Sequence, residues 1–343
     1  MRAATLRDGK MVVEDLDDLE PGPGQVLVEP IACGICGSDL HTVDHAHDMV
    51  ATVHAAGVSN FAFDPDKDVV MGHEMSCRVT GLGQGVTGIA EGDEFAAMPY
   101  LQTPDGPVVV GYSNRFPGGY STQMLLSPDA LLPIPNGLDP TVAALAEPMA
   151  VGLHAVNESS INQDRIALVI GAGPVGLAII ASLAAAGTET IIASDFSATR
   201  RRVAEQMGAH QVIDPAAHSI VDAWREAGDG ISPPVIYEAV GVPGMIDQIM
   251  AESPAHSEIV IAGVCFPSDT FRPSIGIYKH LSLRFVLGWS PQEFAMSLHH
   301  LAEGHIDGAK LITGEVPLND VPQAFADLAD PEHHVKILVR PTQ

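Results

Sequence analysis

The sequence predicts an α/β protein in which a doubly wound parallel sheet is combined with a second, β-rich domain. From Arg165 onward, short apolar runs of strand length alternate with helical stretches, the pattern of parallel strands joined by right-handed crossovers. Residues 1 to about 155 instead contain short β-branched runs separated by Pro and Gly. A length of 343 residues is more than one ordinary core needs and suits two domains.

The parallel sheet is expected to contain six strands. The first strand, at 166–170, precedes a helix of small residues at 175–186, and the second, at 190–194, precedes a helix with three arginines at 198–207. The remaining strands are predicted at 211–213, 235–238, 258–262 and 281–286.

The two ends of the chain are expected to belong to one domain. Strands at 25–29 and 78–81 come before an Ala-rich helix at 143–154. Beyond Trp289 the sequence predicts helices at 291–304 and 321–329 and a final strand at 335–339, which we expect to return to the first domain.

Composition excludes several classes of partner. The formal net charge of −26, from 43 acidic and 17 basic residues, repels nucleic acid phosphates and anionic lipids. The longest apolar stretch, 175–186, is shorter than the roughly 20 residues of a membrane span. Residues 1–8 lack the apolar core of a signal peptide, so a cytoplasmic location is expected.

A glycine-rich turn follows the first strand of the parallel sheet. Gly171, Gly173 and Gly176 have the G-x-G-x-x-G spacing, which lets the backbone approach a pyrophosphate at a helix N-terminus. Asp195 ends the next strand, where a carboxylate would hydrogen-bond the ribose hydroxyls. The sheet is therefore expected to be a Rossmann sheet that binds NAD, because Asp195 would repel a 2′-phosphate. The arginines at 200–202 could hold that phosphate and keep NADP as the less favoured alternative.

The four cysteines do not form the framework of a disulfide-rich protein in a chain of this length. Cys33 and Cys36 have C-x-x-C spacing, which fits a zinc ribbon or a redox pair. A ribbon needs a second pair, and Cys77 and Cys265 stand alone. A catalytic zinc needs only three protein ligands and an open position, which Cys36, His73 and carboxylates could supply.

Four motifs occur in the order found in zinc-dependent medium-chain alcohol dehydrogenases. They are GICGSDLH at 34–41, GHE at 72–74, EPMAVGLHA at 147–155 and GAGPVG at 171–176. Over essentially its whole length the chain resembles this family, especially its sorbitol/threonine dehydrogenase branch and bacterial secondary-alcohol dehydrogenases. The resemblance implies a discontinuous GroES-like β-barrel catalytic domain at 1–155 and 293–343, and a Rossmann domain at 156–292.

The resemblance also implies a metal site. Cys36, His73 and Glu147 are expected to bind one catalytic zinc. Glu74 resembles a second acidic residue that either ligates the metal or exchanges with water, and it is counted among the catalytic residues as well.

The remaining roles follow from the same resemblance. Ser38 is expected to hydrogen-bond the substrate oxygen, and His41 to pass its proton toward solvent through the cofactor ribose. Lys336 stands where the family has a basic residue near the pyrophosphate. The residues expected to bind the cofactor are Gly171, Gly173, Pro174, Val175, Gly176, Asp195, Arg200, Val240, Val264 and Lys336.

Two segments depart from the family pattern. The family's structural zinc is held by four closely spaced cysteines, and 95–119 contains none, so a metal-free loop is expected there. The segment 42–71, with Met49, Val53, Phe61 and Phe63, either covers an apolar substrate cleft or is a surface excursion.

These features predict zinc-dependent, NAD-linked oxidation of a secondary or primary alcohol, with an apolar substrate. A sorbitol-like polyol dehydrogenase, a metal-free quinone or enoyl reductase and a non-catalytic NAD-binding protein are the alternatives. Relatives of this kind are dimers or tetramers, so a homodimer or homotetramer paired through the sheet edge near 281–289 is expected.

Overall fold

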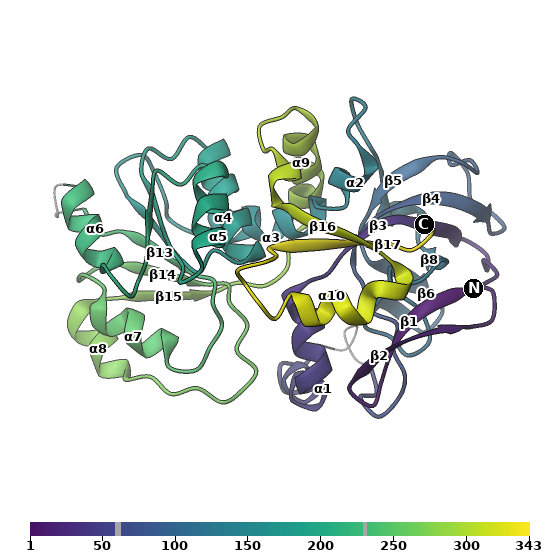
Figure 1. The fold of residues 1–343 in the computed structure, drawn as a ribbon, viewed down its shortest axis with the longest axis horizontal. Coiled ribbons are helices and arrows are strands. Elements are labelled where there is room, and N and C mark those ends of the chain that lie inside the picture. The colour runs from purple at the N-terminus through teal and green to yellow at the C-terminus, as the bar shows by residue number, and fades with distance from the viewer. Residues whose placement is uncertain (59–62, 229–231) are drawn as a thin grey trace.

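The computed structural model describes residues 1–58, 63–228 and 232–343, which form a six-stranded and a seven-stranded sheet with helices around them (Figure 1). Phe61, expected in a cleft-covering segment, lies outside the described residues. Within the described ranges, no helix combines the length and the apolar composition needed to cross a membrane.

The elements follow one another in three stretches. The first stretch contains β1 (Arg2–Arg7), β2 (Lys10–Asp15), β3 (Val26–Gly34), α1 (Gly37–Ala55), β4 (Glu74–Leu82), β5 (Glu94–Ala97), β6 (Tyr100–Thr103), β7 (Gly106–Val109), β8 (Met124–Leu126), η1 (Pro128–Ala130), β9 (Leu131–Pro133), α2 (Pro140–Ala143) and α3 (Ala146–Asn157). The second contains β10 (Ala167–Ile170), α4 (Pro174–Ala185), β11 (Ile191–Ser194), α5 (Ala198–Gln206), β12 (Gln211–Ile213), α6 (Ile220–Ala227), β13 (Val235–Glu238), α7 (Met245–Glu252), β14 (Glu258–Ile261), α8 (Pro273–Lys279) and β15 (Ser282–Phe285). The third contains α9 (Pro291–Ala302), η2 (Gly308–Leu311), β16 (Ile312–Pro317), η3 (Leu318–Asp320), α10 (Val321–Asp327) and β17 (Lys336–Arg340).

The six-stranded sheet is parallel throughout, with the order β12-β11-β10-β13-β14-β15. In chain order this is third, second, first, fourth, fifth and sixth, the order of the Rossmann fold. Its central strands are buried along nearly their whole length, because helices cover both faces of the sheet. The order reverses between β10 and β13, and the carboxyl ends of these strands flank the crevice in which such sheets bind ligands.

The seven-stranded sheet joins the two ends of the chain. Its order is β16-β17-β3-β4-β5-β9, with β8 paired to β3. The last strand, β17, runs antiparallel to β3, with Leu338 opposite Gly34. In Figure 1 the yellow C-terminal strands therefore lie beside the purple and blue N-terminal ones. The domain boundaries at 155/156 and 292/293 remain a prediction.

The segment after His41 begins as a helix, whereas the sequence predicted either a cover over the substrate cleft or a surface excursion and specified no helix. Helix α1 continues to Ala55, with a kink at His45, and buries Asp39, Thr42 and Met49 on one face. Since α1 buries so few side chains, its apolar residues do not form a clear stripe on one face. The helical periodicity is therefore hard to recognise in the sequence.

The cysteine-free stretch 95–119 also contains more structure than the expected loop. Strands β6 and β7 form an antiparallel hairpin in which Thr103 pairs with Gly106. The apolar side chains of Leu101 and Val110 are buried there, so packing organises this part of the chain.

Candidate metal centre and cofactor site

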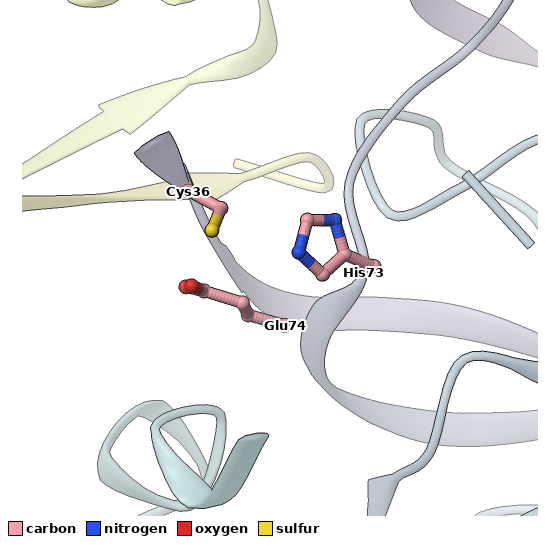
Figure 2. A group of neighbouring side chains, drawn as sticks. All are labelled: Cys36, His73 and Glu74. Carbon is pink, nitrogen blue, oxygen red and sulfur yellow. The ribbon is translucent and has the colours of Figure 1, made fainter. Parts of the chain in front are cut away.

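Three predicted metal-binding side chains meet where α1 and β4 begin. Ligand atoms of Cys36, His73 and Glu74 all lie within 4.8 Å of one another. Figure 2 shows the thiol, the imidazole and the carboxylate converging on the same space. Among the described residues, no other group of three His, Cys, Asp or Glu side chains comes this close. Thiolate, imidazole and carboxylate are together a donor set typical of zinc.

Asp39 orients the imidazole of His73, a role that was not predicted. Its Oδ1 atom lies 3.4 Å from Nδ1 of His73, and both atoms are buried without a hydrogen bond to any other group in the described part of the chain. This leaves Nε2 of His73 on the side of Cys36. A carboxylate behind a histidine fixes the ring and its tautomer in metal sites.

The Asp39 carboxylate is itself held in place from the other side. Its Oδ2 atom accepts hydrogen bonds from the Tyr120 hydroxyl at 2.6 Å and from the Cys36 amide at 3.0 Å. Burial alone would raise the pKa of Asp39, but the charge of His73 and these hydrogen bonds lower it. An acidic residue three positions after an N-cap is a capping signal in the sequence that could have drawn attention to Asp39.

Glu74 is paired with Lys336. Nζ of Lys336 lies 2.9 and 2.8 Å from the two carboxylate oxygens of Glu74 and donates to the Ile35 carbonyl at 3.0 Å. Each residue is 1% exposed. Burial lowers the pKa of Lys336, but the charges of Glu74 and Cys36 and the hydrogen bonds to Glu74 together outweigh this and raise it. A Cβ atom on Gly34 would lie 1.9 Å from a Glu74 oxygen, so the pair requires glycine there.

The partner of Lys336 was not predicted from the sequence. Its expected place near the cofactor pyrophosphate stays a prediction, and in the structure its ammonium group is buried against Glu74. The reason is that β17 lies next to β3, so a side chain at the start of β17 reaches the beginning of β4.

Glu147 stands apart from the three converging side chains, although it was expected as the third ligand. Its Oε1 atom accepts a hydrogen bond from the Trp289 indole at 2.7 Å. Burial, with the nearby charge of Glu74, raises the pKa of Glu147 to about 7 even though the charge of His73 opposes the rise. The sequence predicted Glu147 as the third ligand and Glu74 as the second, reserve carboxylate. In the structure it is Glu74 that converges with Cys36 and His73.

The two residues expected to handle the substrate proton both lie on α1. Ser38 Oγ accepts a hydrogen bond from the Tyr112 hydroxyl at 2.7 Å. His41 is exposed, and the ring of Phe266 approaches it edge-on with a centroid separation of 5.8 Å. Partial burial and the neighbouring His45 lower the pKa of His41. A neutral imidazole in contact with solvent can accept a proton and release it to water.

The glycine-rich turn lies at the carboxyl end of β10 and opens α4. Gly171 has φ +93°, and its Cβ would lie 2.8 Å from Val240. A Cβ on Gly176 would lie 1.9 Å from the Gly171 carbonyl oxygen. Gly173 is the N-cap of α4 and Pro174 occupies its first turn, so free backbone amides face the crevice.

Asp195 and Arg200 stand beside this turn. The Asp195 carboxylate accepts hydrogen bonds from the amides of Ala172 and Ser197, both at 2.8 Å. A guanidinium nitrogen of Arg200 is 3.9 Å from the carboxylate, and Nε of Arg200 is buried without a partner. Both side chains thus lie where the adenosine end of a dinucleotide would bind.

The other predicted cofactor residues border the same crevice. Val240 and Val264 follow β13 and β14 and are both partly exposed. Val175 lies in the first turn of α4 and is half-buried. Exposed apolar side chains at the ends of parallel strands suit the faces of a flat ring system.

All four cysteines are free thiols. Cys33 is fully buried, and burial raises its pKa well above the ordinary value, so it stays a protonated thiol. The ligand atoms that converge include the thiol of Cys36 and not that of Cys33, so the C-x-x-C spacing does not bring a second thiol into this group.

Two protein families have models that match the chain. Residues 22–136 match the alcohol dehydrogenase GroES-like domain, and residues 174–303 match the zinc-binding dehydrogenase family.

Similar proteins align with nearly the whole chain. The (R,R)-butanediol dehydrogenase of Bacillus subtilis (strain 168) is 29% identical, over 99% of this chain and 100% of that protein. A sorbitol dehydrogenase of Halalkalibacterium halodurans is 25% identical, over 97% of this chain and 96% of that protein. The crystal structure of the B. subtilis 2R,3R-butanediol dehydrogenase has a TM-score of 0.84, covers 99% of both chains and is 29% identical. A zinc-binding dehydrogenase from Sinorhizobium meliloti 1021, solved with NADP, has a TM-score of 0.83 at 27% identity, with 99% of both chains covered.

These similarities confirm the predicted fold class, a Rossmann domain combined with a GroES-like domain. They also place the chain among proteins in which zinc and a nicotinamide cofactor recur.

The buried ion pair yields a test of stability. Replacing Lys336 by Met leaves the Glu74 charge buried without a partner, which costs about 3–5 kcal/mol. We expect K336M to lower the free energy of unfolding of the metal-free protein by that amount, measured by urea denaturation. K336R should lose much less, and the double variant K336M/E74Q should recover most of the loss. A K336M variant within about 1 kcal/mol of the parent would show that the pair does not stabilise the fold.

Proposed function

Because the chain belongs to the zinc-dependent medium-chain alcohol dehydrogenase family, we propose that it binds one catalytic zinc and oxidises alcohols with NAD. The observation that carries this proposal is the convergence of Cys36, His73 and Glu74. The domain division at 155/156 and 292/293 is part of the proposal, with the zinc and the cofactor held by different domains.

The donor set fits zinc. Cysteine, histidine and a carboxylate leave a fourth position open in a tetrahedral site, as catalytic zinc sites require. The buried Nδ1 of His73 faces Asp39, so its other nitrogen is directed to the metal. We propose Cys36, His73 and Glu74 as ligands, and Glu147 as a nearby carboxylate that replaces Glu74 or adds to the set.

The residues around the site support alcohol oxidation. Bound zinc would lower the pKa of the alcohol, and the nicotinamide would accept hydride from the carbinol carbon. Ser38 would hydrogen-bond the reacting oxygen of the substrate, and His41 would pass the proton that this oxygen loses on to solvent through the cofactor ribose. Asp39 and Lys336 would hold His73 and Glu74 in position while this occurs.

The metal assignment is tested by removing the thiol. We expect C36A to lose its zinc and to lose alcohol oxidation, while NADH affinity stays nearly unchanged because the glycine-rich turn lies in the other sheet. Zinc is measured by elemental analysis and NADH binding by fluorescence titration.

The neighbouring cysteine supplies a matched control. C33A removes the other thiol of the C-x-x-C pair and should retain one zinc per chain. E74Q should weaken zinc binding more than E147Q if Glu74 is the third ligand. Turnover like that of the parent protein in C36A would refute the metal site, and loss of zinc in C33A would point to a two-cysteine site.

We propose NAD as the preferred cofactor. The carboxylate of Asp195, held by two backbone amides, would accept hydrogen bonds from both ribose hydroxyls and repel a 2′-phosphate. Arg200, close by with an unpartnered Nε, would favour that phosphate if Asp195 were absent.

This preference is tested by removing the carboxylate. Because like charges in contact cost several kcal/mol, D195S should raise the ratio of kcat/KM for NADP over NAD by about 100-fold or more. The double variant D195S/R200A should lose most of that gain. A parent enzyme that already prefers NADP would contradict the proposal.

We propose that the chain forms a homodimer or homotetramer through β15. This strand is the last in the order of its sheet and, among the described strands, pairs with β14 alone. Phe285 is 65% exposed and Leu287 is 82% exposed beside that edge, and Ile277 and Tyr278 on α8 are also exposed. An open strand edge next to apolar side chains is the surface that a second copy covers in an isologous dimer.

Charging the exposed edge tests the association. L287D should dissociate the assembly into folded single chains, because burying an unpaired carboxylate in the interface is costly. M296D, at an exposed methionine on α9, should leave the assembly intact. Molar mass is measured by light scattering after gel filtration. A single-chain mass for the parent protein would refute the proposed association.

A further inference from the structure

Three histidines that the proposed alcohol oxidation does not use lie together at the C-terminal end of α9. The ring centroid of His305 is 5.4 Å from that of His300 and 6.2 Å from that of His299, and the latter two are also 6.2 Å apart. In the described part of the chain, no carboxylate forms an ion pair with any of them, although the chain has 43 acidic residues. Exposed histidines elsewhere, such as His218 and His333, do lie beside a carboxylate.

The turn after α9 brings His305 back beside the helix. Gly304 has φ +71°, and the amide of Ile306 donates a 3.2 Å hydrogen bond to the carbonyl of His300. The Ile306 side chain is 5% exposed and belongs to the apolar core. Backbone and core contacts thus hold residues 300 and 305 side by side, which gives their imidazoles a fixed base.

The two imidazoles face each other through nitrogen atoms that can bind a metal. Nδ1 of His300 lies 3.2 Å from Nδ1 of His305, and the two ring planes are inclined by 58°. Two nitrogens on one tetrahedral zinc ion, each about 2.0–2.1 Å from it, are about 3.3 Å apart. A metal ion lies in the plane of each imidazole that binds it, and two inclined planes can share such a point. The pair therefore has the spacing of two ligands of one ion.

The protonation state of the pair also suits a metal. A neutral imidazole donates from one nitrogen and accepts at the other, so a single shared proton holds the two rings together when no ion is bound. Burial and the neighbouring His305 and His299 lower the pKa of His300, which keeps this ring neutral at neutral pH. A cation then meets nitrogen lone pairs instead of positive charge, on a chain whose net charge of −26 attracts it.

His299 stands beside this pair as a third imidazole. The nitrogens of the three rings do not converge within the 4.8 Å found for Cys36, His73 and Glu74. The His299 side chain is exposed, however, and a rotation about its side-chain bonds turns the ring toward the pair. Three imidazoles with water in the remaining position make a complete tetrahedral set.

We propose that His300 and His305, with His299 as a third ligand, bind a divalent transition-metal ion, for which zinc is the probe. Imidazole suits ions such as zinc and copper, whereas magnesium and calcium prefer oxygen ligands. The site is separate from the catalytic zinc of the proposed function and does not depend on it. Because it is exposed and has no thiolate, it releases zinc to a chelator more readily than the metal centre does.

The first experiment counts zinc in a protein that lacks the catalytic thiol. C36A without a histidine tag is dialysed against a chelator and titrated with ZnCl2 by isothermal calorimetry. We expect one zinc per chain, and no binding of MgCl2. In C36A/H305A the affinity for zinc should fall by about 100-fold or more, because even an outer partner of a ligand is worth about 10-fold to 100-fold. Absence of zinc binding in C36A, or an unchanged affinity in C36A/H305A, would overturn the proposal.

The third ligand has a test of its own. In C36A/H299A the affinity for zinc should fall by about tenfold or more. An affinity equal to that of C36A would remove His299 from the ligand set.

A second pair of histidines supplies a matched control. The rings of His256 and His280 are stacked, with centroids 5.1 Å apart and planes inclined by only 9°. Their nitrogen lone pairs lie in nearly parallel planes and cannot meet at one ion. Both residues have positive φ, which asparagine tolerates, so both are replaced by asparagine. C36A/H256N/H280N should bind zinc as tightly as C36A.

Thermal unfolding gives a second readout. An ion that binds the native protein stabilises it by mass action, so ZnCl2 should raise the Tm of C36A but not that of C36A/H305A. Without metal the two variants should unfold at the same temperature, because the His305 side chain is exposed. An equal rise of Tm in both variants would show that zinc stabilises the protein through another site, against the proposal. H305A alone should leave alcohol oxidation unchanged, so the two metal sites are tested separately.

Discussion

The buried ion pair between Glu74 and Lys336 is the constraint on which the rest of the structure depends. It connects the beginning of β4 to the beginning of β17, across β3, and joins residues 262 positions apart in the sequence. Two charges this deep are tolerated only because they satisfy each other and the carbonyl of Ile35. The absence of a side chain at Gly34 makes room for the carboxylate. The last strand of the chain is thus fixed to the first third by charge as well as by backbone pairing.

The same junction sets the geometry of the metal centre. Cys36 lies two residues after the end of β3, and His73 immediately precedes β4, so both are positioned by strands that the ion pair connects. Asp39, one turn into α1, reaches back to the Cys36 amide and across to His73. Rigid strands supply the ligands, and buried partners hold their orientation, which is how precise sites are built.

The sequence predicted local features well and long-range contacts poorly. Strand 166–170 and the helix after it were expected within two residues of β10 and α4, because apolar periodicity and glycine spacing are properties of neighbouring residues. The partners of Glu147 and Ser38 were missed, since they lie 142 and 74 positions away. Whether Glu74 or Glu147 stands closer to Cys36 depends on such contacts, and both carboxylates fit the motif equally well. The pairing of Lys336 with Glu74 was missed for the same reason.

The partners of these two carboxylates also give them different charges. Glu74 faces the ammonium group of Lys336, whereas Glu147 faces the neutral indole of Trp289, and burial raises the pKa of Glu147 to about 7. Lys336 therefore offsets one of the buried negative charges beside the metal centre, while its contact with Glu74 also joins the last strand of the chain to β4 across β3.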